Sequence, residues 1–237
     1  MAANYHSRPN VEVVHAAGIE GARGERAAVV VIDVIRAFTV AAWAFARGAI
    51  ECRLTDTVAE AVALAASIPG SVLSAEEDGL PVAGIALSNS PSQVRALDLK
   101  GRVLVMRSSA GTRGAVAARD AQVLLGAALV NASATARFLR RLEPPRVTLL
   151  STGALDGHPE DRACADFIEA LLRERPPPPI DRLLAPLRVT GRYRRLLQGR
   201  QPGFPAEDLE LCLAVDAFDF AMRAAGGRLF RVDPDAG

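Results

Sequence analysis

Cysteine and histidine, which build most zinc centres and disulfide frameworks, are scarce in this sequence. There are three cysteines and three histidines among 237 residues. The cysteines, Cys52, Cys164 and Cys212, are odd in number and far apart, so they match neither a zinc-binding spacing nor a set of disulfides. The sequence therefore predicts a reduced, cytoplasmic protein.

The sequence also lacks an excess of charge of one sign and a long apolar run. Lys and Arg number 28 against 27 Asp and Glu, which gives a net charge of +1. This balance argues against a protein that binds nucleic acid or a membrane surface through charge, so any anion site must be local. Residues 1–10 are polar and do not resemble a signal peptide, and no apolar stretch approaches the ~20 residues that span a bilayer.

Several motifs that would identify a nucleotide-binding or hydrolytic site are absent. The turn Ser108–Gly114 follows an apolar run and is rich in Ser, Gly and Thr, but it has neither the GK[ST] ending of a Walker loop nor a GxGxxG pattern. There is no GxSxG turn and no HExxH motif. The turn could still bind a phosphate or sulfonate through backbone N–H groups and hydroxyls, although tight-turn chemistry alone would also account for it.

Half of the residues are hydrophobic, enough for a sizeable core, and their order is that of a layered α/β protein. Apolar strand candidates alternate with polar loops and helical stretches, which predicts an α/β fold with a largely parallel sheet. The expected strands are 11–15, 29–32, 50–54, 72–73, 103–106, 122–125, 147–150 and 228–232; the expected helices are 38–47, 58–68, one starting at Pro91, 132–142, 160–175 and 207–225.

A run of prolines at residues 176–179 interrupts this alternation, and residues 180–204 beyond it are rich in arginine. The run is either a linker to a small subdomain or a stiff loop across one surface. We predict a single domain over residues 1–237, with a C-terminal excursion or small subdomain after the prolines. The composition also suits a homodimer, and no residue pattern decides this.

The segment from Ala27 to Thr39 is the centre of the predicted site. Val29–Ile32 is typical of a strand buried on both faces, and Asp33 and Arg36 follow where it ends. Because ligands bind at the carboxyl ends of strands in open α/β sheets, Asp33 could hold a divalent cation and Arg36 could bind a phosphate or sulfonate. The alternative, which this segment alone favours, is that Asp33 caps the next helix and Arg36 lies on its surface.

Polar clusters follow four separate expected strands, and their coincidence is more informative than any one of them. Carboxylates with few histidines suit a hard cation such as Mg²⁺ better than zinc. His158 could act as a general acid, although a surface position is the more ordinary role for a loop histidine. The acids could also be a solvated loop or complement a helix dipole. The four clusters are Asp33 with Arg36, Glu76–Asp78, Ser108–Gly114 and Asp156–Asp161.

Together these segments resemble one family, the 2-phosphosulfolactate phosphatases of the coenzyme M pathway. The matching pieces extend in the same order over nearly the whole chain. They are VVVIDVIRAFTVAAWAFARGA (29–49), the loop at Glu76, LSNSP (87–91), GTR (111–113), LLGAALVNASATA (124–136), PEDRACADFI (159–168), and the C-terminal piece 193–197 with Asp208, Cys212 and Asp216.

The resemblance implies a three-layer α/β/α fold with a parallel or mixed sheet. It implies a Mg²⁺-dependent phosphatase that converts 2-phosphosulfolactate, a small phosphorylated anion, to sulfolactate and phosphate. The residues that it implies are Asp33, Glu76, Glu160 and Asp161 for the metal; Asp33, Arg36, Glu76 and Asp161 for catalysis; and Arg36, Asn89, Ser108, Ser109, Gly111, Thr112 and Asn131 for the substrate.

The chain differs from the pattern of this family at several positions. Phe38 and Val40 replace smaller or hydroxylated residues close to Asp33. Ala110 replaces the Asn of a TNGT motif, Glu77 stands where an Arg is frequent, and Ala86 lies in an apolar segment where an Asp is frequent. Three functions therefore remain open. The chain could hydrolyse 2-phosphosulfolactate, hydrolyse another small phosphorylated hydroxy acid, or be a non-catalytic relative that binds an anion.

Overall fold

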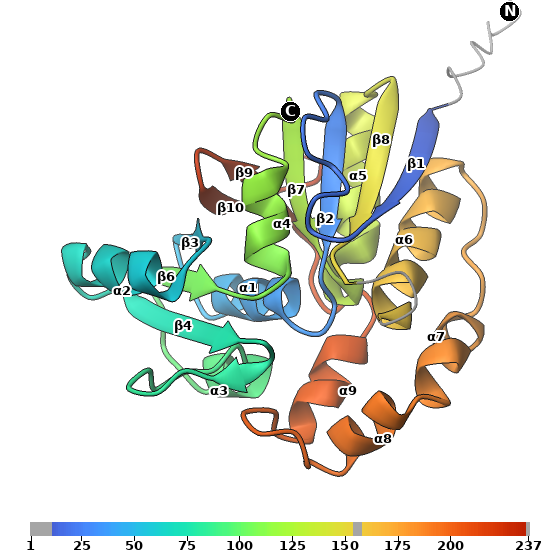
Figure 1. The fold of residues 1–237 in the computed structure, drawn as a ribbon. Helices are drawn as coiled ribbons and strands as arrows, with labels where there is room; N and C mark the ends of the chain where they lie inside the picture. Colours follow the sequence, from blue (N-terminus) through green and yellow to red (C-terminus); the bar gives the residue numbers. More distant parts are fainter. Residues whose placement is uncertain (1–10, 154–157, 236–237) are drawn as a thin grey trace, which may run out of the picture.

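Figure 1 shows the computed structural model, which describes residues 11–153 and 158–235. Asp156 of the fourth polar cluster and residues 1–10 lie outside these ranges. The described strands form one mixed sheet in the order β1-β8-β2-β7-β9-β10-β3-β6-β4-β5. Their bounds are β1 Glu12–Ala17, β2 Ala28–Ile32, β3 Glu51–Thr55, β4 Val72–Glu77, β5 Leu80–Pro81, β6 Val103–Arg107, β7 Val123–Ala127, β8 Arg146–Ser151, β9 Ala221–Ala225 and β10 Arg228–Val232.

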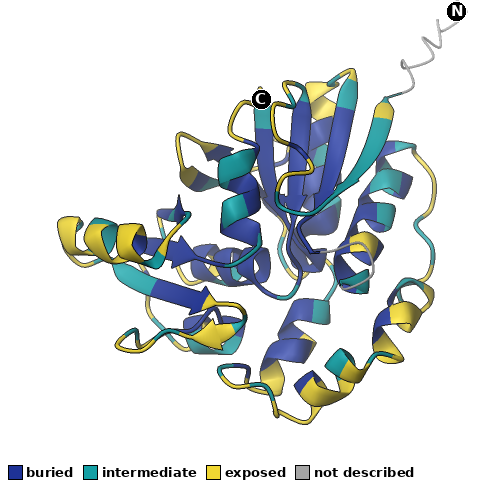
Figure 2. Cartoon of the chain, in the orientation of Figure 1, coloured by how far each residue is buried: buried dark blue, intermediate teal, exposed yellow. Residues whose placement is uncertain are grey.

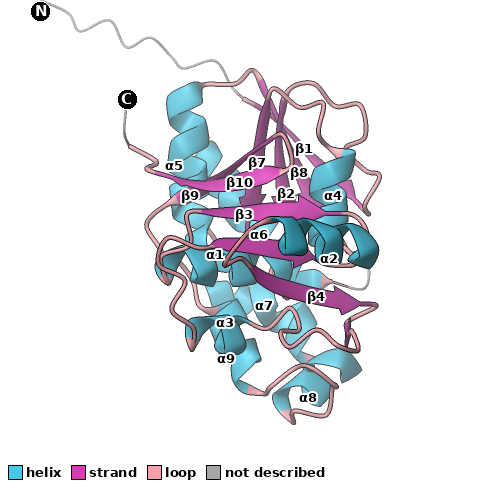
Figure 3. Ribbon diagram, turned by 90° about the vertical axis from the view of Figure 1, so that its left-hand side faces the viewer, coloured by secondary structure: helices cyan, strands magenta, loops and turns pink. Residues whose placement is uncertain are grey.

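Helices cover both faces of this sheet. α2 and α4 lie on one face, and α1, α5 and α6 lie on the other (Figure 3). The expected α/β fold with three layers is therefore confirmed. The bounds are α1 Ala37–Ala46, α2 Val58–Ser67, α3 Pro91–Arg95, α4 Gly111–Ala117, the 3-10 helix η1 Leu129–Asn131, α5 Ala132–Leu142, α6 Pro159–Leu172, α7 Ile180–Arg188, α8 Gly191–Leu197 and α9 Glu207–Leu213.

The sheet consists of two parallel groups joined by a hairpin. β1, β8, β2 and β7 are parallel to one another, and so are β3, β6 and β4. The hairpin β9–β10 pairs antiparallel with β7 on one side and with β3 on the other. The twist of the sheet turns the second group nearly across the first (Figure 3), so the carboxyl ends of β2, β4 and β6 approach one region.

The central strand β2 is buried on both faces, as its unbroken apolar run predicts. Val29 to Ile32 have no exposed surface. Phe38 of α1 packs onto the neighbouring strand β7 at Gly126, where a Cβ would overlap the Phe38 ring. The absence of a side chain at Gly126 therefore lets α1 lie close to the sheet, and this fixes the turn 33–36 that enters the helix. Figure 2 shows these strands as the buried centre of the molecule.

The prediction of a helix over residues 207–225 is wrong for its second half. Helix α9 ends at Leu213, and residues 221–225 form strand β9. The segment between them is held by contacts with the start of α5, because the Asp216 carboxylate accepts hydrogen bonds from Ser133 N at 2.8 Å and Ser133 Oγ at 2.6 Å. Phe218 N donates to Val130 O at 2.9 Å. These distant partners override the local preference for a helix.

The acidic residues after β4 also differ from the expected loop. Glu76 and Glu77 belong to the strand itself, which turns back through Asp78 and Gly79 into the short strand β5. This hairpin places the Glu76 side chain at the carboxyl end of a buried strand and makes it part of the sheet edge.

The arginine-rich segment after the prolines forms two helices, α7 and α8, that were not expected from the sequence. Figure 2 shows that both are largely exposed on their outer sides. α7 packs against α6, and Leu196 of α8 joins Phe204 and Leu209 in a small buried cluster of its own. Among the described residues, no helix has the length and apolar character that crossing a bilayer requires.

Candidate active site

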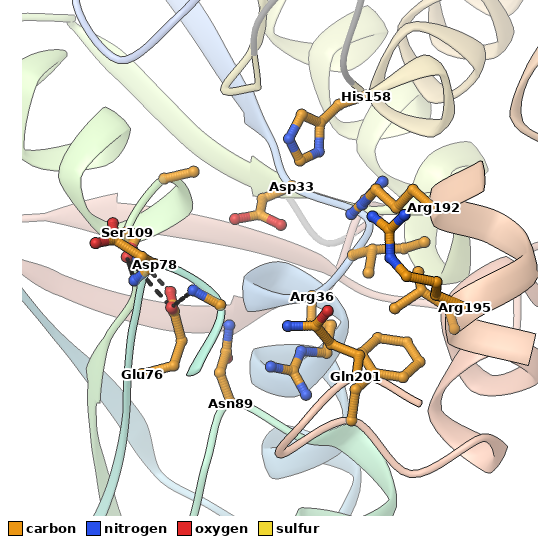
Figure 4. A pocket seen from close by; sticks show the side chains of 15 residues that line it. Asp33, Arg36, Glu76, Asp78, Asn89, Ser109, His158, Arg192, Arg195 and Gln201 are labelled. Atoms are coloured by element: carbon orange, nitrogen blue, oxygen red, sulfur yellow. Dashed lines mark hydrogen bonds between the residues drawn. The ribbon is translucent and has the colours of Figure 1, made fainter. Parts of the chain in front are cut away.

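A pocket of about 320 Å³ lies where the strand ends of the two parallel groups meet. Figure 4 shows two opposing walls. The strand-end wall comprises Asp33, Glu76, Asp78, Gly79, Asn89, Ser109 and Ala110, and the helical wall comprises Arg192, Arg195, Leu196, Gln201 and Phe204; Ile35, Arg36 and His158 complete the lining.

Asp33 follows β2 directly and is 5% exposed. Its Oδ1 accepts a hydrogen bond from Ala37 N at 3.2 Å, so the residue helps to start α1 and also faces the pocket. Burial raises the pKa of the Asp33 carboxyl and the charge of Glu76 adds to this, whereas His158 and the backbone N–H groups of Ala37 and Gly111 act in the opposite direction. Asp33 makes no ion pair with another described residue, so its charge is available to a ligand.

Glu76 is also 5% exposed and is held by the turn around it. Its Oε2 accepts hydrogen bonds from Gly79 N at 2.6 Å and Ser109 Oγ at 3.2 Å, and its Oε1 accepts one from Ser109 N. These donors are neutral, and within the described residues no cationic side chain pairs with the Glu76 carboxylate. The strand-end wall therefore presents two buried carboxylates, Asp33 and Glu76, that make no ion pair with any residue in the described part of the chain.

Arg36 is buried, in contrast to the surface position that the alternative interpretation gave it. It is 5% exposed, and its Nη1 donates to Gly203 O at 2.6 Å and lies 3.3 Å from Asp208 Oδ2. Its guanidinium carbon lies 4.8 Å from the centre of the Phe204 ring. Asp208 has no exposed surface. These contacts fix the guanidinium at the pocket, and all three partners come from residues 203–208, which follow α8 in the chain.

Glu160 and Asp161, at the start of α6, lie behind the pocket and do not line it. Asp161 is 2% exposed and accepts a hydrogen bond from Val34 N at 2.8 Å, which holds the chain next to Asp33. Burial and the charges of Glu160 and Asp33 raise the pKa of Asp161 well above its usual range. Asp161 thus supports the position of Asp33 from behind.

Glu160 has no exposed surface and contacts two basic groups of the pocket, His158 and Arg192. Its Oε1 accepts hydrogen bonds from Arg192 Nη1 at 2.5 Å and contacts His158 Nδ1 at 3.3 Å. Burial alone would raise the pKa of Glu160, but the hydrogen bond with His158 and the charge of Arg192 outweigh it and lower the pKa. The Oε2 atom is buried and has no partner among the described residues. Glu160 therefore orients Arg192 and His158 at the edge of the pocket.

The predicted anion-binding turn contributes less to the pocket than expected. Ser109 and Ala110 line it, whereas Ser108 and Thr112 are turned inward. Ser108 Oγ accepts from Thr112 N at 2.9 Å and Thr112 Oγ1 accepts from Ser108 N at 2.8 Å, so the two hydroxyls bind the turn to the start of α4. A Cβ at Gly111 would lie 2.6 Å from Asp33 Oδ2, and the glycine therefore permits the close approach of this turn to Asp33.

The two predicted asparagines have different positions. Asn89 lines the pocket and its amide points into it (Figure 4). Asn131 is wholly buried at the end of η1, where its Oδ1 accepts a hydrogen bond from Ala128 N at 3.0 Å. Asn131 supports the turn after β7 and is not among the lining residues.

Sequence reasoning missed Arg192, Arg195 and Gln201, and for His158 it preferred a surface position over the role of a general acid. The ring of His158 lies over Gly153, where a Cβ would overlap it, and Glu160 holds its Nδ1. The available signal was the arginine-rich segment 180–204, but its spacing does not indicate which arginines face Asp33. Of the departures from the family pattern, Ala110 alone lines the pocket. Glu77 pairs with Arg107 at 3.5 Å outside it, Ala86 is exposed elsewhere, and Phe38 and Val40 are buried in α1.

The three-layer α/β/α fold thus carries a candidate site in which two carboxylates face arginines across one pocket. The chain belongs to the 2-phosphosulpholactate phosphatase family, whose model matches residues 15–226. This is a family of phosphoric monoester hydrolases.

Three relatives illustrate the similarity, and each is named a probable 2-phosphosulfolactate phosphatase. The protein from Bacillus subtilis (strain 168) is 30% identical over 194 residues, which cover 82% of this chain and 85% of the relative. The protein from Carboxydothermus hydrogenoformans is 36% identical over 151 residues, or 64% of this chain and 63% of the relative. The protein from Thermus thermophilus is 39% identical over 126 residues, or 53% and 52%.

Proposed function

We propose that this protein is a Mg²⁺-dependent phosphatase that hydrolyses 2-phosphosulfolactate to sulfolactate and phosphate. The observation that carries the proposal is the pair of buried carboxylates, Asp33 and Glu76, that face one pocket and make no ion pair with residues 11–153 or 158–235. Family membership supports the phosphatase chemistry, and the names of the relatives support the substrate.

The residues of the pocket fit a magnesium ion. Burial and the charge of Glu76 both oppose ionisation of Asp33, so a cation between the two carboxylates would relieve an unfavourable charge. Mg²⁺ commonly binds to one or two carboxylates and takes its remaining ligands from water and substrate phosphate. Asp33 and Glu76 would hold the ion, which would neutralise charge that develops on the phosphoryl oxygens.

The remaining residues suit the other parts of a phosphorylated acid. Arg36 provides a fixed guanidinium for an anionic oxygen, because its contacts with Asp208, Gly203 and Phe204 prevent it from swinging away. Asn89 and the Ser109 hydroxyl supply neutral polar groups on the strand-end wall. His158 lies close enough to Asp33 to stabilise its charge. Such preorganised groups stabilise a phosphoryl-transfer transition state without rearrangement.

The direct test is phosphate release from 2-phosphosulfolactate with Mg²⁺, and again after chelation with EDTA and re-addition of the metal. We expect hydrolysis that EDTA abolishes and Mg²⁺ restores. Equal hydrolysis in EDTA would remove the metal from the proposal, and an absence of hydrolysis under all conditions would remove the substrate.

A second candidate is hydrolysis of another small phosphorylated hydroxy acid, and Ala110 is the observation that favours it. This residue lines the pocket where the family pattern has an Asn, so one polar contact is missing. A panel of phosphorylated three-carbon acids, assayed beside 2-phosphosulfolactate, decides between the two by the ratio of kcat/KM. A cytoplasmic location and a homodimer stay predictions from the sequence.

A further inference from the structure

The three arginines of the pocket differ in how their charges are balanced. Arg36 pairs with Asp208 at 3.3 Å and Arg192 pairs with Glu160 at 2.5 Å. Arg195 also lines the pocket, yet it makes no ion pair with any residue in the described ranges. A guanidinium without an internal partner can bind an anion without breaking an existing ion pair, so Arg195 is the group best prepared for one.

Helix α8 is anchored in a way that keeps Arg195 at the pocket. Thr190 Oγ1 accepts a hydrogen bond from Tyr193 N at 3.0 Å and caps the helix, and Leu196 is 4% exposed against Phe204. Arg192 and Arg195 are three residues apart, so they lie on the same face of the helix. The Arg192–Glu160 pair holds this face toward the pocket.

The position of Arg195 also fits a particular part of the substrate. Figure 4 shows Arg192 and Arg195 across the pocket from Glu76 and Ser109. The proposed function places the reacting phosphoryl group near Asp33 and Glu76, and the rest of the substrate must then extend toward the helical wall. The opposite end of a phosphorylated acid carries a carboxylate or a sulfonate.

We infer that Arg195 binds the anionic group of the substrate that is not transferred, with Arg192 as the positioning residue that orients its helix face. This inference rests on the proposed function. Arg195 is then a specificity-determining residue, because it selects phosphate esters that carry a second anionic group, a carboxylate or a sulfonate, over simple phosphate esters. A guanidinium suits both carboxylate and sulfonate, since its paired N–H groups match two oxygens.

The test compares Arg195→Gln with Arg194→Gln, its neighbour on the same helix. Arg194 is exposed and does not line the pocket, so it controls for the loss of one positive charge. Four esters are used: 2-phosphosulfolactate, phospholactate with its carboxylate only, the phosphate ester of 2-hydroxyethanesulfonate with its sulfonate only, and glycerol 2-phosphate with neither. Binding of sulfolactate is measured by calorimetry in parallel.

We expect Arg195→Gln to raise KM for 2-phosphosulfolactate by about 10- to 100-fold, the effect of one charge-assisted contact, with a much smaller change in kcat. KM for glycerol 2-phosphate should change by no more than about twofold, as should every value for Arg194→Gln. A large effect on phospholactate assigns the contact to the carboxylate, and one on the sulfonate ester assigns it to the sulfonate.

Two results would overturn the inference: equal effects of the two variants, or an equal loss on glycerol 2-phosphate. Failure of the proposed function is a separate result, in which the wild-type protein hydrolyses none of the four esters. In that case calorimetry still decides the role of Arg195. Weaker sulfolactate binding in Arg195→Gln alone supports it, and unchanged binding refutes it.

Discussion

The two walls of the pocket are built in different ways. The strand-end wall places Asp33 and Glu76 on or beside buried strands, and both residues are 5% exposed. The helical wall consists of the short, largely exposed helix α8 and the segment that follows it, which pack on the small cluster of Leu196, Phe204 and Leu209. One wall is therefore part of the main core, and the other is attached to it through a few contacts.

We therefore expect the two walls to have different roles, one at the reacting group and the other in substrate selection. Groups that must hold a metal and a reacting phosphoryl group need fixed positions, which a sheet edge provides. Groups that select the rest of the substrate can lie on a segment that varies without disturbing the core. Arg36 connects the two, because it starts at the end of β2 and pairs with Asp208 of α9. Four predictions test this comparison.

The largest effect is expected from Asp33→Asn on the strand-end wall. Loss of the carboxylate should lower kcat/KM for 2-phosphosulfolactate by at least about 10³-fold, as expected for removal of a preorganised charge at the reacting group. The fold should not be weakened, since burial already raises the pKa of Asp33 and the neutral amide avoids that cost. Phosphate release and thermal unfolding measure the two effects.

Asp181→Asn is the matched control for this variant. Asp181 lies in α7, is 80% exposed and pairs with Arg188, and neither residue is among those that line the pocket. Its kcat/KM should stay within about twofold of wild type. Retention of full activity in Asp33→Asn would show that the strand-end wall does not carry the chemistry.

The second prediction concerns the connection between the walls. Arg36→Gln leaves the wholly buried Asp208 without its cation, so the free energy of unfolding should fall by about 3 kcal/mol. The double variant Arg36→Gln with Asp208→Asn should recover part of this loss, because it removes the unpaired charge. Urea unfolding of both variants measures the difference. Equal stability of the single variant and wild type would mean that the helical wall is attached without this pair.

The third prediction concerns the hairpin that joins the two parallel groups. Glu51 of β3 accepts a hydrogen bond from Arg228 Nε of β10 at 2.7 Å and one from Arg53 Nε at 2.5 Å. Burial opposes ionisation of Glu51, but these arginines outweigh it and lower its pKa. The resulting stabilisation is present above the usual carboxyl range and is lost as the pH falls through the lowered pKa.

Glu51→Gln should therefore cost about 1.5 kcal/mol of unfolding free energy at pH 7, and the difference from wild type should shrink on acidification below about pH 4. Urea unfolding at several pH values measures it. Glu12→Gln, at an exposed position that makes no ion pair with another described residue, should follow the wild-type curve. A difference for Glu51→Gln that grows on acidification would contradict the assigned ion pairs.

The smallest effect is expected from Ala110→Asn on the strand-end wall. If 2-phosphosulfolactate is the substrate, one added amide at the pocket should lower its KM about threefold to tenfold, the effect of one hydrogen bond. Ala86→Asn, exposed and outside the pocket, should leave KM unchanged. A rise in KM for 2-phosphosulfolactate, with a fall for another ester of the panel, would favour the second candidate substrate.

Sequence alone predicted the strand-end wall better than the helical wall. The buried strand β2 has an unbroken apolar run, which marks where it ends and places Asp33 at a ligand-binding edge. Glu76 was found for the same reason, although the strand continues through it. Arg192 and Arg195 could not be found in this way, because they reach the pocket through the packing of Leu196 and Phe204, far along the chain from Asp33.

The secondary structure, too, could be predicted only where it is determined by the local sequence. Residues 132–142 form the expected helix α5 and residues 228–232 the expected strand β10, since each has a clear local pattern. Residues 207–225 have helical composition throughout, but the helix does not continue to residue 225. Asp216 instead accepts hydrogen bonds from Ser133 of α5, a contact that the local sequence does not reveal. Likewise, Ser108 and Thr112 have the side chains of an anion-binding turn, but each hydroxyl accepts a hydrogen bond from the backbone N–H of the other residue.

The position of the hairpin β9–β10 has a consequence for how the protein is made. These two strands follow all the others in the chain, yet they lie in the middle of the sheet, between β7 and β3. During synthesis both parallel groups emerge from the ribosome first, and two edges that are interior in the finished sheet, β7 and β3, are then open and can pair with a strand from another chain. Residues 221–232 close both edges at once, so a nascent chain stalled before them is the form most exposed to aggregation and to chaperones.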